Sequence, residues 1–105
     1  MAKYLLEVNY TLDGMRGVKA HGGSARVAAT TELIESIGGK LESFNFALGA
    51  TDVYVVADFP DNVSAVAALA VCAGGGATAR TVPLLTAAEV DSAAAKNSTY
   101  RPPAS

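Results

Sequence analysis

Four basic side chains lie close together between Arg16 and Arg26. They are Arg16, Lys19, His21 and Arg26, and they flank Gly22-Gly23 at the expected start of a helix. Free backbone N–H groups and the positive end of the helix dipole favour a carboxylate or phosphate at such a place. The cluster therefore predicts a site for a small anionic ligand. The structural alternative is a solvated basic turn, and the spacing matches no phosphate-loop pattern.

A second set of candidates combines one histidine with polar side chains of expected strands. His21 is the one histidine of the chain, and histidine is the residue type that most often serves as a general acid or base. Tyr54 and Arg80 are the other catalytic candidates, and Glu7 and Asn9 are candidate ligand-binding residues beside them. In the structural alternative His21 is an exposed loop residue and Arg80 pairs with an acidic neighbour across strands. Whether the chain is an enzyme stays open.

Composition excludes several classes of function. The net charge of −2 and the lack of a dominant basic patch argue against nucleic acid and anionic membranes as partners. A single histidine and the lone Cys72 cannot build a Cys/His metal site within one chain, so neither a metal nor another cofactor is expected. Without a secretory signal or an apolar run long enough to span a bilayer, the expected location is the cytoplasm. Cys72, in an alanine-rich segment, is expected to be buried and unreactive.

Hydrophobic periodicity predicts alternating strands and helices. The first long helix is expected to have Ser24 as its N-cap and to end at Gly38-Gly39. A tight hairpin is expected at Gly49, which would take a positive φ, and Asp52 would stabilise this turn. Strands are expected at 3–10, 40–48, 53–59 and 77–85, a turn or single helical turn at 11–17, and helices at 24–37, 63–73 and about 87–96, the last capped by Thr86 and Glu89.

This element order predicts an α+β domain with the ferredoxin-like split βαβ fold (β-α-β-β-α-β). The expected sheet has four antiparallel strands with both helices on one face and a short C-terminal helix added. Pro83 marks the last strand as an edge, and the dense apolar run 53–59 indicates a central strand covered on both sides. Residues 1–96 form the single expected domain, and 97–105 a flexible tail or an arm on a neighbour. The uncharged helix 63–73 is apolar nearly all round, which predicts a homodimer or higher homo-oligomer.

The chain resembles the GYD-domain proteins, which belong to the dimeric α/β-barrel superfamily. The resemblance covers most of 1–90. It rests on Thr11, Gly14, Arg16 and Lys19, on Ser36-Ile37-Gly38-Gly39-Lys40, and on Phe44, Leu48-Gly49, Asp52-Val53 and 58–61. The chain departs from the Gly-Tyr-Asp signature, where Thr51 replaces the tyrosine.

The resemblance implies an architecture more than an activity. It implies two sheets paired face to face in a dimer. Several relatives in the superfamily bind small molecules, either between the helices and the sheet or between the two sheets. Some of those relatives are cofactor-free oxygenases or isomerases, and some bind haem. We therefore expect an oligomeric protein that binds a small organic or anionic ligand at or near a subunit interface. The alternatives are a cofactor-independent monooxygenase or isomerase and a purely structural assembly unit.

Overall fold

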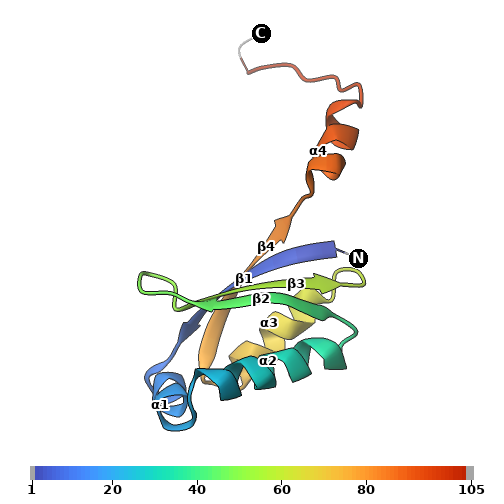
Figure 1. The fold of residues 1–105 in the computed structure, drawn as a ribbon. Coiled ribbons are helices and arrows are strands. Elements are labelled where there is room, and N and C mark those ends of the chain that lie inside the picture. The colour runs from blue at the N-terminus through green and yellow to red at the C-terminus, as the bar shows by residue number, and fades with distance from the viewer. Residues whose placement is uncertain (1, 104–105) are drawn as a thin grey trace.

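The computed structural model describes residues 2–103, which form a four-stranded antiparallel sheet with α2 and α3 on one face (Figure 1). The strand order β2-β3-β1-β4 interleaves two crossovers, as the split βαβ topology requires. The predicted α+β, ferredoxin-like class and the short C-terminal helix are confirmed. The elements are β1 (Ala2–Tyr10), α1 (Leu12–His21), α2 (Gly23–Ser36), β2 (Lys40–Phe46), β3 (Val53–Phe59), α3 (Ser64–Ala73), β4 (Ala77–Leu84) and α4 (Ala87–Ala94).

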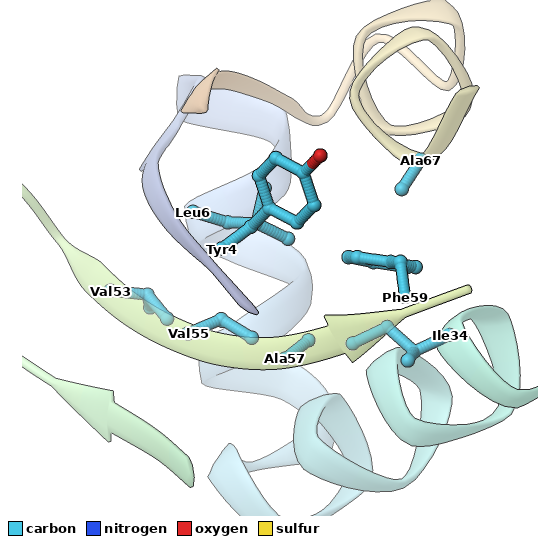
Figure 2. Packing of buried hydrophobic residues seen from close by; sticks show 8 residues of the cluster. All are labelled: Tyr4, Leu6, Ile34, Val53, Val55, Ala57, Phe59 and Ala67. Atoms are coloured by element: carbon cyan, nitrogen blue, oxygen red, sulfur yellow. The ribbon is translucent and has the colours of Figure 1, made fainter. Parts of the chain in front are cut away.

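The core lies between the sheet and the two helices that cover it. Alternate residues of β1 and β3 point toward the helices, where α2 contributes Ile34 and α3 contributes Ala67 (Figure 2). Phe59 is fully buried at the end of β3, and its ring lies 5.8 Å from that of Tyr4. The buried cluster comprises Tyr4, Leu6, Ile34, Val53, Val55, Ala57, Phe59 and Ala67.

The strand positions agree with the sequence, and one face of the central strand is covered by helices. Among residues 2–103, β4 pairs with β1 alone and carries Pro83, so it is an edge as predicted. β3 pairs with both β1 and β2. In the single chain the helices cover one face of β3, and Tyr54 is 39% exposed on the other face, which carries no helix; covering of that face by a partner stays a prediction. We call this helix-free face of the sheet the open face.

The segment after β1 is more helical than its glycines suggest. Instead of a turn or single helical turn, α1 runs through Gly14 and Gly17 to His21. The Thr11 hydroxyl caps it by accepting a hydrogen bond from the Gly14 N–H at 3.1 Å. Ser24 is not the N-cap of α2, because Gly22, at a φ of 88°, takes that place and the helix begins at Gly23.

The connection between β2 and β3 is also built differently from the predicted hairpin. Gly22, Gly38 and Gly75 are the glycines with positive φ, so the expectation for Gly49 is wrong. β2 ends at Phe46 and leaves a longer, exposed loop that contains Leu48. Gly38 follows the end of α2 and has a φ of 82°, a backbone conformation that stops a helix, so the predicted helix stop is confirmed.

The C-terminal helix α4 stands clear of the sheet at the end of β4 (Figure 1). Its predicted capping box is present: the Thr86 hydroxyl accepts from the Glu89 N–H, and the Glu89 carboxylate accepts from the Thr86 N–H at 3.0 Å. The latter bond holds the pKa of Glu89 below its usual value. The helix ends at Ala94, before the expected Lys96. Of the predicted tail 97–105, residues 104 and 105 lie outside the described part.

Helix α3 presents one face to the sheet and the other to solvent. Ser64 and Ala67 are buried, whereas Val66 and Leu69 are exposed. Cys72 follows Leu69 by one helical turn and is exposed as well, so the expectation of a buried thiol is wrong. The apolar, alanine-rich sequence of α3 is therefore not buried on every side in the single chain.

Candidate functional site

A cavity of about 290 Å³ lies between the sheet and the two helices that cover it. Helix α2 supplies one wall with residues three or four apart, which places them on one side of that helix. Helix α3 supplies the opposite wall with small residues, and the strands β1 and β3 supply the floor. The wall residues of α2 are Arg26, Ala29, Thr30, Leu33 and Ile34, those of α3 include Ala67, Ala70 and Val71, and the floor includes Leu6, Val8, Tyr10, Val53 and Val55.

The small side chains of the walls explain why this space is open. Ala29 lines the wall formed by α2, and Ala67 and Ala70 line the wall formed by α3, where larger residues would fill the gap between helix and sheet. Cavities of this kind lack partner atoms for dispersion contacts, so an apolar ligand that enters restores those contacts. The lining is therefore suited to the apolar body of a small molecule.

Two polar side chains with unused hydrogen-bonding groups line the same cavity, Tyr10 and Arg26. Within residues 2–103, the Arg26 guanidinium forms no ion pair and the Tyr10 hydroxyl forms no hydrogen bond. The Thr30 hydroxyl also lines the wall, but it donates to the Arg26 backbone carbonyl at 2.9 Å. Burial raises the pKa of Tyr10, the positive charge of Arg26 opposes this shift and the negative charge of Asp52 adds to it.

Asp52 fixes the strand end that carries Tyr10. Its carboxylate accepts the Tyr10 N–H at 2.9 Å, and its own N–H donates to the Val8 carbonyl at 3.1 Å and to Asn9 Oδ1 at 3.0 Å. Asp52 therefore has a structural role, as predicted, but its carboxylate bonds the neighbouring strand β1 and not the backbone of its own turn.

Replacing Asp52 by alanine is expected to lower the free energy of unfolding by about 2 kcal/mol, because the half-buried Tyr10 N–H loses its charged acceptor. Asp52→Asn keeps an acceptor oxygen and should recover most of that loss. Urea denaturation measures both, with Asp91→Ala as the control, since Asp91 is exposed on α4. A loss for Asp52→Ala no larger than the control's would contradict the role given to the carboxylate.

The predicted basic cluster is divided between two helices. Arg16, Lys19 and His21 belong to α1, and Arg26 belongs to the first turns of α2. Arg16 lies 3.8 Å from Asp13 in an exposed ion pair. Of the four, Arg26 alone lines the cavity, so the structure separates it from the other three.

The other predicted residues gather on the open face of the sheet. Glu7 stands opposite Tyr54 on β3 and opposite Arg80 on β4, with Arg80 Nε 4.0 Å from Glu7 Oε2. This contact is the cross-strand pairing that the structural alternative describes. Asn9 instead accepts the Asp52 N–H. Glu7, Tyr54 and Arg80 do not line the cavity, nor does His21, and the catalytic roles of His21, Tyr54 and Arg80 stay predictions.

Sequence reasoning missed Tyr10 and the alanine walls as parts of a site. The alternation of β1 placed Tyr10 on the same side as Tyr4 and Leu6, and the period of α2 places Arg26, Ala29 and Leu33 on one side. Those two patterns together could have indicated a helix–sheet pocket with one arginine. The distance between helix and sheet, which sets the volume, could not be read from them.

Two further properties concern only the part of the chain that the structure describes. No three His, Cys, Asp or Glu side chains of residues 2–103 converge as metal ligands. No helix there combines the length and the apolar character needed to cross a membrane.

Comparison with known proteins places the chain in a family. No curated protein and no solved structure gives a significant match. A family model does match, over residues 4–94, and it is that of the GYD domain. The matched range contains α1 to α4, all of β2, β3 and β4, most of β1, and both walls of the cavity. The chain therefore belongs to the GYD-domain family.

Proposed function

We propose that this GYD-domain protein is a homo-oligomer that binds one small organic ligand per subunit in the cavity between α2, α3 and the sheet. The observation that carries the proposal is the cavity itself: about 290 Å³, mostly apolar walls and two free polar groups. Natural ligand sites combine such walls with a few polar groups that orient the ligand. The exposed, single Cys72 is compatible with a reducing compartment, which supports the cytoplasm as the location.

The open face of the sheet supports self-association. Val56, Leu5 and Val82 stand side by side across β3, β1 and β4, and they form an apolar row through the middle of this face. The polar row of Tyr54, Glu7 and Arg80 lies next to it. A second copy of the chain could cover the apolar row and keep the ion pair, in the face-to-face arrangement that the superfamily resemblance implies.

Binding is better supported than catalysis. A general acid or base must lie within hydrogen-bond reach of the reacting group. The candidates His21, Tyr54 and Arg80 do not line the cavity, and the titratable groups of its walls are Tyr10 and Arg26. The ligand site that this proposal names lies on the helix side of the sheet, within one subunit, and not on the open face.

Filling the cavity tests the proposal. Ala29 lines the cavity, whereas its neighbour Ala28 is exposed and does not. Ala29→Leu is expected to weaken the binding of 2-naphthol by about tenfold or more, since the added side chain takes the ligand's place, while leaving stability unchanged or higher. Ala28→Leu is the matched control. Fluorescence titration at an excitation wavelength selective for naphthol is practical because the chain has no tryptophan.

Two results would contradict the proposed site. Wild-type protein that does not bind 2-naphthol would show that the cavity does not accept a small apolar ligand. Equal affinities of Ala29→Leu and Ala28→Leu, with both variants folded, would place the ligand elsewhere on the protein.

A further inference from the structure

We propose that the cavity selects monoanionic ligands with an apolar body, such as aromatic monocarboxylates, and that Arg26 binds the carboxylate with the Tyr10 hydroxyl as a second donor. This inference rests on the proposed function and names the ligand class of the same site. It assigns to Arg26 and Tyr10, which both line the mostly apolar cavity, the two donors that hold the carboxylate.

Arg26 is the charged group of the cavity lining. Three other cations form ion pairs with carboxylates: Lys3 with Glu42, Arg16 with Asp13 and Arg80 with Glu7. Arg26 has no such partner among the described residues, so its donors are free for a ligand. A guanidinium matches a carboxylate with two parallel hydrogen bonds, which makes arginine selective for this group.

The position of Arg26 sets how such a ligand would lie. Arg26 is exposed, whereas Leu33 and Ile34, farther along the same wall of α2, are half-buried and buried. The charged end of the cavity is therefore the end nearest solvent. A carboxylate bound there stays partly hydrated, and the apolar body enters between the helices and the sheet, which avoids the cost of burying an ion completely.

Tyr10 supports an anion rather than a cation at the same place. A tyrosine hydroxyl carries its proton at neutral pH and can donate to a carboxylate oxygen, and burial raises the pKa of Tyr10 further. Tyr10 and Arg26 line the same cavity, and the Arg26 charge acts on the pKa of Tyr10 against the effect of burial. A protonated phenol and a guanidinium are both donors, and together they favour an acceptor with negative charge.

The overall charge of the protein does not explain a preference for anions. With a net charge of −2, the long-range field of the chain repels an anion weakly. Selection for an anion must then come from the local arrangement, and one arginine neutralises one carboxylate. A second negative charge in the ligand would have no cation in the lining to pair with.

The volume limits the apolar body. Cavities of about 150 Å³ lined by apolar residues hold benzene. A space of about 290 Å³ accommodates a larger body, of the order of a fused two-ring system with one substituent. The compounds 2-naphthoate and 2-naphthol therefore form a suitable pair, since they share the body and differ in charge.

The test measures the affinities of both compounds for the full chain and for two variants of equal charge. In wild-type protein, 2-naphthoate is expected to bind about tenfold more tightly than 2-naphthol. Arg26→Gln is expected to remove this preference and to leave 2-naphthol binding within about twofold, because the arginine is exposed and contributes little to the apolar contacts. Arg16→Gln, which removes the same charge from α1, should keep the preference. The dianion 2,6-naphthalenedicarboxylate should bind more weakly than 2-naphthoate.

The outcomes separate this inference from the proposed function. Binding of 2-naphthol without any preference for 2-naphthoate overturns the inference and leaves the cavity as a site for neutral ligands. Equal losses in Arg26→Gln and Arg16→Gln also overturn it, because the preference would then come from general electrostatics. If neither compound binds wild-type protein, both the inference and the proposed function are wrong.

Discussion

Gly14→Ala is expected to lower the free energy of unfolding by about 3 kcal/mol or more, which corresponds to a fall in Tm of roughly 10–20 °C for a domain of this size. A Cβ atom at position 14 would lie 1.8 Å from the Gly76 carbonyl oxygen and 2.8 Å from its carbonyl carbon. Both are backbone atoms, so no side-chain rotation can relieve the contact. The backbone at Gly76 is also held, since its carbonyl accepts the Thr11 N–H at 3.0 Å just before β4 begins.

Gly17→Ala supplies a control of opposite sign on the same helix. Nothing lies within 4 Å of a Cβ built at Gly17, so alanine there should stabilise α1 by about 0.5–1 kcal/mol through its higher helix propensity. Thermal and urea denaturation of both variants measure the difference. Similar stabilities for the two variants would contradict the close approach between α1 and the segment before β4.

The second large effect concerns self-association through the open face. Val56→Lys is expected to raise the dissociation constant of the oligomer by about 100-fold or more and to give a folded monomer, because it places a charge in the apolar row beside Leu5. Val56 is half-exposed in the single chain, so the fold itself should tolerate the change. Size-exclusion chromatography with light scattering measures the mass, and circular dichroism checks the fold.

Val66→Lys distinguishes the open face from the other exposed apolar surface. Val66 is 52% exposed on the solvent side of α3, near Leu69, and this is the helix whose apolar sequence first suggested an oligomer. With the open face as the interface, Val66→Lys remains oligomeric. A monomer from Val66→Lys and an oligomer from Val56→Lys would move the interface to α3, and a wild-type monomer at micromolar concentration would exclude both surfaces.

Local patterns in the sequence predicted most of the fold. The alternation from Tyr4 to Tyr10, the apolar run from Val53 to Phe59 and the proline in β4 each carry their own information on strand type and position. The capping box of Thr86 and Glu89 predicted the start of α4. These features depend on residues near one another in the chain, which is why they were correct.

The errors arose where distant segments decide the local structure. α1 continues through Gly14 because the glycine fits against Gly76 of another segment, and the β2–β3 connection is fixed by Asp52 bonding to β1. The candidate site follows the same rule. Arg26 was named as a ligand-binding residue among basic neighbours, but Tyr10, which lines the same cavity, comes from β1, and only the packing of α2 on the sheet places both residues in one lining.

The most direct test of the central claim, that the helix–sheet cavity binds a small organic ligand, is a titration of methyl-labelled protein with 2-naphthoate, followed by NMR. We expect saturable chemical-shift changes at the methyl groups of the cavity walls and floor, Ala29, Leu33, Val55 and Val71 among them. Methyl groups of the open face, those of Leu5, Val56 and Val82, should stay unchanged. Changes confined to the open face, or no saturable change at any methyl group, would contradict the claim.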